Sequence, residues 1–221
     1  MRELRISWCG QSYFIIGSGN ARLAIDPHDG DSLGLPRCEA NADYILVTHD
    51  HYDHNSVETA RGPKTKAVAF SREGSFTLGP FSVTGFRLPH DPEGGSRYGW
   101  TTAYLVEAEG LRVMHMGDVG VGPVDYIIRS VGKVDVIMVP AGDVTTVKQA
   151  EALDWAARLG AKLVLPMHYW VAGSNVPLDP IDVMLSLWHG SVTKLGEPLD
   201  IEPGRLNGPA LVILPLESEP S

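Results

Sequence analysis

The first half of the chain is a series of short runs rich in β-branched and aromatic residues, separated by Gly or Asn turns. Runs of this kind, bounded by turn residues, are typical of β-strands. One of them, ADYILVT at residues 42–48, is apolar for most of its length and predicts a buried strand. The predicted strands span residues 4–8, 12–16, 22–25, 42–48, 66–70, 81–88, 101–108 and 111–116.

The second half alternates between helical and strand patterns. An apolar stripe at helical spacing predicts a helix over residues 146–159, and two shorter helices are predicted over 124–131 and 181–188. Strands are predicted over 134–139, 161–167 and 211–214. Many strands followed by a β-α-β-α section indicate an α/β fold of two sheets with helices packed outside. Because no repeat, low-complexity tract or linker interrupts the pattern, we expect a single domain over residues 1–221.

Composition removes several classes of function. The formal net charge is −9 and Lys and Arg form no run, which argues against nucleic-acid or acidic-membrane binding. No apolar stretch approaches the roughly 18 residues of a membrane span. Cys9 and Cys38 are too few for a disulfide framework and form no CxxC, and the opening residues MREL hold no apolar signal-peptide core. We therefore expect a reducing, cytoplasmic location. The sequence leaves the oligomeric state open.

Candidate chemistry is concentrated in THDHYDHN at residues 48–55, which holds three of the eight histidines. His49 and His51 lie two residues apart where a strand ends, so both side chains can point the same way. Asp53 and His54 follow where the chain should turn into a helix, so this second pair can face a neighbouring point. Imidazole nitrogens and carboxylates suit zinc and similar divalent ions. The segment therefore predicts ligands for two adjacent metals rather than a solvated, His-rich loop.

Two metals need more ligands than these four, and three further candidates each follow an apolar β-run. His90 follows FSVTGFRLP, Asp118 follows LRVMHMG, and His168 follows AKLVLPM. A single such residue is more often part of the core or the surface. Three in the same position, directly after a predicted strand, indicate a common site.

Together these residues resemble the metallo-β-lactamase fold superfamily, whose pattern is HxHxDH followed by His, Asp and His. The resemblance implies a four-layer αββα sandwich with the metals at one edge between the sheets. It also implies two ligand groups with one bridging carboxylate: His49, His51 and His90 for one metal, Asp53, His54 and His168 for the other, and Asp118 between them.

Shorter motifs point to a branch of that superfamily. WCGQSYFI at residues 8–15 and IDP at 25–27 resemble elements of the small metal-dependent hydrolases, which include ascorbate-6-phosphate lactonase-like and N-acyl phosphatidylethanolamine phospholipase D-like proteins. HMGD at 115–118 and PMHY at 166–169 resemble further elements of that branch. Gln11 stands where the branch usually has His, and we expect its side chain to keep a hydrogen bond to a strand end.

The resemblance implies a metal-dependent hydrolase. Two divalent ions, zinc first and manganese or iron as alternatives, would generate a bridging hydroxide that attacks a lactone, a phosphoester or a related ester or amide. Asp53, His54 and Asp118 are the catalytic candidates, with Asp53 orienting the hydroxide. The expected partner is a small-molecule substrate, and Arg97 in the loop 91–100 would suit one with an anionic group. The alternatives are a glyoxalase II-like thioester hydrolase and a non-catalytic metal-binding member of the fold.

Two residues outside the ligand set are candidates for supporting roles. Asp26, at the end of a predicted strand, could accept a hydrogen bond from a ligand imidazole. His115 lies three residues before Asp118 on the same strand and should point to the opposite face as a buried structural residue.

Overall fold

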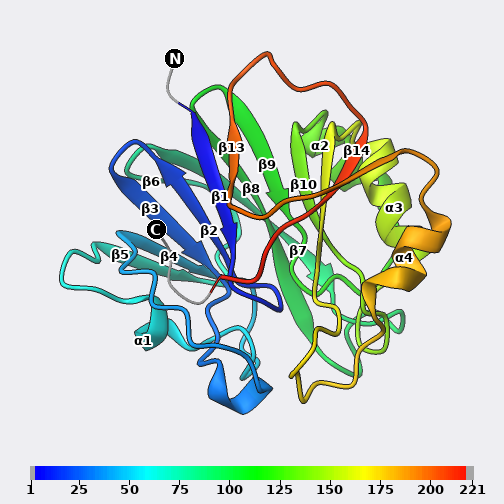
Figure 1. Cartoon of the computed structure of the whole chain (residues 1–221), viewed down its shortest axis with the longest axis horizontal. Helices are drawn as coiled ribbons and strands as arrows, with labels where there is room; N and C mark the ends of the chain where they lie inside the picture. Colours follow the sequence, from blue (N-terminus) through cyan, green and yellow to red (C-terminus); the bar gives the residue numbers. More distant parts are fainter. Residues whose placement is uncertain (1–2, 218–221) are drawn as a thin grey trace.

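The computed structural model describes residues 3–217, and its strands form two sheets that pack face to face (Figure 1). The first sheet has the order β13-β1-β2-β3-β4-β5. Neighbours are antiparallel from β13 to β3 and parallel from β3 to β5. Its strands are β1 (Leu4–Trp8), β2 (Phe14–Ser18), β3 (Ala21–Ile25), β4 (Tyr44–Val47), β5 (Ala67–Phe70) and β13 (Leu199–Ile201).

The second sheet has the order β12-β14-β11-β10-β9-β8-β7-β6. It is antiparallel from β6 to β9 and parallel from β9 to β12. As a result, β7, β9, β10 and β11 all run in the same direction, and their carboxyl ends meet at one edge. The strands are β6 (Gly74–Leu78), β7 (Phe81–Pro89), β8 (Trp100–Ala108), β9 (Leu111–His115), β10 (Val136–Pro140), β11 (Leu163–Met167), β12 (Ser191–Lys194) and β14 (Ala210–Ile213).

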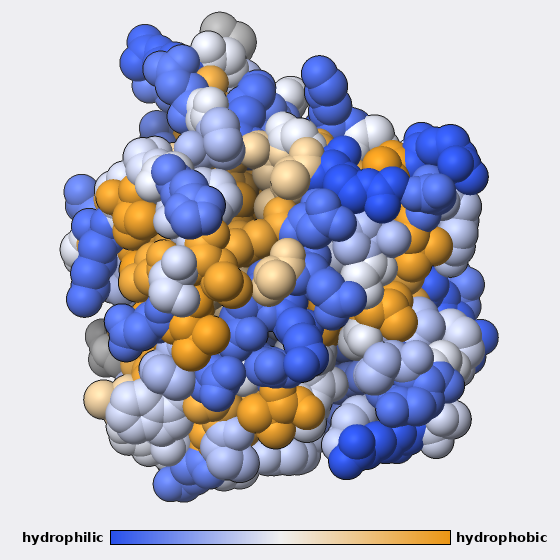
Figure 2. All heavy atoms as spheres, turned by 90° about the vertical axis from the view of Figure 1, so that its right-hand side faces the viewer, coloured by the Kyte–Doolittle hydropathy of each residue, from blue (hydrophilic) through white to orange (hydrophobic). Residues whose placement is uncertain are grey.

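Helices form the outer layers. In Figure 1, α2 (Asp125–Val131), α3 (Gln149–Arg158) and α4 (Ile181–Leu187) lie outside the second sheet, and the short α1 (Val57–Ala60) lies beside β4 of the first. Figure 2 looks onto the side that carries α3 and α4, where hydrophobic side chains gather in patches bordered by hydrophilic ones. Within α4, Val183 and Leu187 stay 36% and 42% exposed, so this helix does not bury its whole apolar surface.

The period of the strands explains how the first sheet is buried on both faces. Phe14 and Ile16 of β2 belong to the large core between the sheets, whereas Ile15 belongs to a smaller cluster on the opposite face. Because successive side chains of a strand point to opposite faces, one short apolar run supplies both layers. The smaller cluster includes Cys9 and Cys38.

The predicted α/β sandwich is confirmed, and each predicted strand and helix is present with bounds that differ by a few residues. Three strands were not predicted. β12 is exposed along its whole length, and β6 is exposed at three of its five positions, so neither has the hydrophobic pattern of a buried strand. β13 has only three residues, too few for a pattern to be recognised. Within residues 3–217, no helix is long and apolar enough to cross a membrane.

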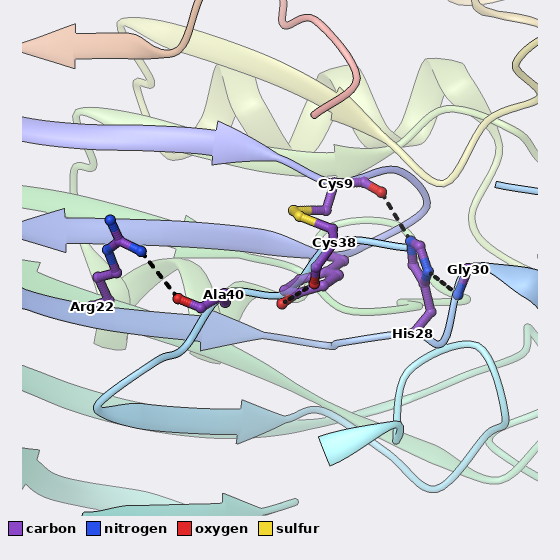
Figure 3. The surroundings of a disulfide bond; sticks show 7 residues. Cys9, Arg22, His28, Gly30, Cys38 and Ala40 are labelled. Atoms are coloured by element: carbon purple, nitrogen blue, oxygen red, sulfur yellow. Dashed lines mark hydrogen bonds between the residues drawn. A yellow bond between two sulfur atoms is a disulfide. The ribbon is translucent and has the colours of Figure 1, made fainter. Parts of the chain in front are cut away.

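The expectation that both cysteines stay reduced is wrong for this structure, because Cys9 and Cys38 form a disulfide (Figure 3). The segment after β3 folds back over the outer face of the first sheet and brings the two Cα atoms to 5.9 Å. Two cysteines are too few for the multi-bridge frameworks of small proteins, but that count does not exclude a single bridge in a chain with a large core. The inference from reduced cysteines to a cytoplasmic location loses this support, and the location stays a prediction.

Candidate metal centre

The seven candidate ligands converge on the edge where strands of both sheets end. His49, His51, Asp53 and His54 follow β4 in the first sheet. The other three follow strands of the second sheet that run in the same direction: His90 after β7, Asp118 after β9 and His168 after β11. Residues up to 119 positions apart in the sequence therefore meet because parallel strand ends share an edge.

The ligand atoms form two groups. One group is His49, His51 and His90, and the other is Asp53, His54, Asp118 and His168; within each, one candidate ligand atom per residue lies within 4.8 Å of the rest. In the first group, His49 Nε2 and His51 Nδ1 are 3.0 Å apart. Most of these side chains are buried, and only His51 is partly exposed.

Asp118 connects the two groups. Its Oδ2 lies 3.1 Å from His168 Nε2 and 3.2 Å from His54 Nε2, both in its own group. The same oxygen lies 3.4 Å from His90 Nε2 in the other group. Asp118 is 2% exposed, so its charge is almost entirely removed from water. This is the position in which a carboxylate could be shared by two cations.

Hydrogen bonds on the far side of each ring indicate which nitrogen is left with a lone pair. His54 Nδ1 lies 2.9 Å from Asp26 Oδ2, and His90 Nδ1 lies 3.1 Å from the carbonyl oxygen of Thr145. Both oxygens can only accept, so each Nδ1 carries the proton. In a neutral ring, Nε2 of His54 and of His90 then presents a lone pair to the carboxylate of Asp118, with no hydrogen-bond partner.

The same reasoning applies to His49. Thr48 Oγ1 donates to Asp26 Oδ2 at 2.7 Å, so its oxygen is free to accept from His49 Nδ1 at 2.9 Å. The lone pair of His49 is then on Nε2, which lies 3.0 Å from His51 Nδ1. Asp26 thus organises two rings, one directly and one through Thr48, and its predicted contact with a candidate ligand imidazole is observed.

The pKa values of the histidines in the second group indicate that their Nε2 atoms require a proton or a cation. Burial disfavours a charged His54, but the carboxylates of Asp118, Asp53 and Asp26 outweigh it and raise the pKa of this histidine well above its usual value. Burial opposes the charge of His168 as well, yet Asp118 raises its pKa to about 9. The lone pairs must therefore be either protonated or coordinated. A divalent cation satisfies several of them at once, so the donor set fits metal ions.

Gln11 contacts this centre, contrary to the expectation that its side chain bonds a strand end. Its Nε2 donates to Asp53 Oδ2 at 3.2 Å, while its backbone oxygen accepts from His168 N at 3.0 Å. Ser12 Oγ lies 3.4 Å from Asp118 Oδ1. The turn after β1 therefore touches both carboxylates. These contacts depend on the φ of +51° at Gln11, which no hydrophobic pattern indicates.

His115 is a buried structural residue, as predicted. It is fully buried, its Nε2 donates to the carbonyl oxygen of Ser12 at 2.9 Å, and its Nδ1 accepts from Gly117 N. It therefore holds the turn that contacts the centre without reaching the centre itself.

A pocket of about 480 Å³ opens above the candidate ligands. Tyr98 lines it, with its ring 5.6 Å from the ring of His90, whereas neither Arg97 nor Trp100 does. The Arg97 guanidinium stacks on Tyr98 at 4.8 Å, and Trp100 stacks against Arg87. The predicted rim loop 91–100 thus reaches the pocket through one residue. The pocket also has walls at residues 144–145 and 176–178, and both belong to irregular loops.

The fold and the site together define a two-sheet α/β sandwich with a metal-ligand cluster at its edge, and comparisons with known proteins agree. A model of the beta-lactamase superfamily domain matches residues 5–168. A UPF0173 protein of Pyrococcus furiosus is 32% identical over 200 residues, covering 80% of this chain and 87% of its own length. A UPF0173 metal-dependent hydrolase of Methanoculleus marisnigri is 31% identical, covering 75% and 81%.

A solved structure of a metallo-β-lactamase superfamily protein from Thermotoga maritima is also similar. Its TM-score is 0.77 at 26% identity, and the match covers 96% of this chain and 98% of that one. The chain therefore belongs to the beta-lactamase superfamily and, within it, to the UPF0173 family.

Proposed function

We propose that this protein is a hydrolase that works with two divalent metal ions held by the seven clustered side chains. His49, His51 and His90 would hold one ion, Asp53, His54 and His168 the other, and Asp118 would be shared. The observation that carries the proposal is the position of Asp118 Oδ2, within 3.1 to 3.4 Å of imidazole nitrogens from both groups.

Family membership supports the enzyme class. Relatives in the UPF0173 family are named metal-dependent hydrolases, and the enzyme class expected from the sequence agrees with them. The donor set of imidazoles and carboxylates suits zinc and also accepts manganese or iron. We propose zinc because five of the seven donors are histidines.

When bound, such ions lower the pKa of water to near neutral and polarise a carbonyl or phosphoryl oxygen. The protein's own residues position and desolvate the reactants. Asp53 and Asp118 both line the pocket, so a substrate can reach their carboxylates. Burial opposes ionisation of Asp53, but His54 and His168 hold its pKa far below the usual range, so it stays a carboxylate that can hold a cation and orient a water by accepting its hydrogen bond. Gln11 fixes the orientation of that carboxylate.

Elemental analysis of purified variants tests the two-ion arrangement. We expect about two ions per chain in the unaltered protein and about one in His90→Ala, which loses a ligand of the first group only. Asp118→Ala should hold fewer ions than His90→Ala, because its carboxylate is placed to serve both groups. His189→Ala, at an exposed position away from the centre, is the control and should keep both. One ion in the unaltered protein that persists in His90→Ala would contradict the proposal.

A further inference from the structure

Among the residues that the structure describes, no lysine or arginine lines the pocket above the candidate ligands. The charged side chain at its rim, apart from the candidate ligands, is Asp50, an acid whose carboxylate accepts from Asn55 Nδ2 at 2.7 Å. Proteins that bind phosphate or carboxylate groups usually present Arg or Lys to them. Here Arg97 is directed onto the Tyr98 ring and does not line the cavity. Apart from the candidate ligands, the described part of the chain thus supplies negative charge and no positive charge to a substrate.

Opposite the candidate ligands, the pocket is apolar. Val176, Pro177 and Leu178 form one wall after β11, and Val144 stands on the loop after β10. A cavity of about 480 Å³ lined in this way suits an uncharged group with several carbons.

Val144 has a conformation that its side chain does not favour. Its φ is +61°, in the left-handed region, where a β-branched residue is a genuine outlier. Its side chain is nevertheless 57% exposed, so burial in the core does not compensate for the strain. Residues held in such strained conformations cluster at functional sites.

The shape of the loop after β10 explains why the backbone at residue 144 has a positive φ, but it does not explain why that residue is a valine. The turn at residues 143–145 brings the carbonyl oxygen of Thr145 to His90 Nδ1, and this requires positive φ at Asp143 and Val144. Gly or Asn would adopt that backbone with less strain. A valine at this position gains nothing within the protein that those residues would lose, except an apolar surface facing the pocket.

We propose that the pocket takes an uncharged ester, lactone or amide with an apolar acyl group, and that Val144 contacts that acyl group. This inference rests on the proposed hydrolase function and narrows it: beyond the ions themselves the pocket offers no Lys or Arg to an anionic group, so charged phosphoesters are disfavoured as substrates.

p-Nitrophenyl esters of increasing acyl length test the inference, because the leaving group and the bond that is broken stay the same along the series. With the zinc-loaded protein, kcat/KM for p-nitrophenyl hexanoate should exceed that for the acetate by about tenfold or more, because added methylenes are buried. Rates that do not depend on acyl length would overturn the inference. So would a kcat/KM for bis-p-nitrophenyl phosphate above that for every ester, or no ester hydrolysis at all.

Val144→Gly separates contact with substrate from stability of the fold. Relief of backbone strain should leave Tm equal or higher, while the ratio of kcat/KM for hexanoate over acetate should fall at least about threefold. Val192→Ala truncates a similarly exposed valine of β12, 49% exposed and outside the pocket, and should leave the ratio of kcat/KM for hexanoate over acetate unchanged. If Val144→Gly kept the full preference for hexanoate, Val144 would not be the acyl contact.

A third variant distinguishes failure of this inference from failure of the proposed function. Asp118→Ala should abolish ester hydrolysis at every acyl length. If it does, and acyl length has no effect on kcat/KM in the unaltered protein, the proposed hydrolase function is retained and the proposed acyl-binding site is rejected. If Asp118→Ala retains the ester hydrolysis, the proposed function as a metal-dependent hydrolase is rejected.

Discussion

At the scale of single residues, the sequence named the candidate ligands but not the groups that direct them. A histidine directly after an apolar strand is visible in the sequence because its place depends only on where the strand ends. Contacts such as Gln11 with Asp53, or Thr145 with His90, depend on loop conformations with positive φ, which no local pattern of hydrophobic residues encodes. Asp26 was an intermediate case, since its position after β3 suggested a contact with an imidazole but not which one.

Asp26 should control metal affinity through His54 and Thr48. Its carboxylate accepts from Thr48 N, Thr48 Oγ1 and His54 Nδ1, and all of these groups are buried. Asp26→Asn keeps the shape and tolerates the φ of +54°, but it weakens the acceptor that fixes the His54 tautomer. We expect zinc affinity to fall about 10- to 100-fold, measured by competition with a chelator.

The matched control for Asp26→Asn is Asp143→Asn. Asp143 also has positive φ, at +51°, and lies in a loop near the centre, but its carboxylate is outside both ligand groups. Its substitution should leave zinc affinity unchanged. Equal losses in the two variants would mean that any nearby negative charge, rather than the hydrogen bonds of Asp26, sets the affinity.

At the scale of elements, burial decided what could be predicted. Strands such as β4, buried at every position, give continuous apolar runs, whereas β12 is exposed throughout and gives none. The segment between β3 and β4 has neither a helical nor a strand pattern of hydrophobic residues, so its course could not be predicted from the sequence. It returns to β1 through the disulfide, and Leu33 in the same segment accepts from Asn175 N at 2.8 Å, next to the pocket wall. An element without regular structure thus joins the outer face of the first sheet to the rim of the site.

The disulfide should contribute to stability through the loop that it closes. Cys9 and Cys38 are 29 positions apart, which corresponds to about 3.5 kcal/mol from loss of chain entropy in the unfolded state. The paired substitution Cys9→Ala with Cys38→Ala should lower the free energy of unfolding by about that amount, measured by urea denaturation. Reductant should destabilise the unaltered protein to a similar extent and leave the paired variant unaffected. If the unaltered protein had the same free energy of unfolding with and without reductant, the disulfide would not contribute to stability.

At the scale of the whole molecule, the two sheets are the reason that a metal centre exists where it does. The apolar core between them fixes the relative position of β4 and of β7, β9 and β11, so ligands from both sheets are held before any ion arrives. This arrangement could be predicted in outline because the order of apolar runs indicates two packed sheets, and the histidines and aspartates that follow those runs indicate the ligands. The pocket depends on how irregular loops from both halves of the chain approach each other, and it could be described only from the structure.

Removing metal should therefore destabilise the whole sandwich rather than a local loop. Without cations, the buried carboxylates of Asp53 and Asp118 must be balanced by protonated histidines, and this arrangement replaces coordination by weaker contacts. An ion present at about 100 times its Kd stabilises the folded state by about 2.7 kcal/mol, which for a chain of this size is a Tm shift of about 5–10 °C. Calorimetry in EDTA should show that loss in one cooperative transition, and zinc should restore it. In His90→Ala, which retains the second ligand group, zinc should restore a smaller shift. An unchanged Tm in EDTA, with metal removal verified by elemental analysis, would contradict this prediction, because an ion that binds only the folded state must stabilise it.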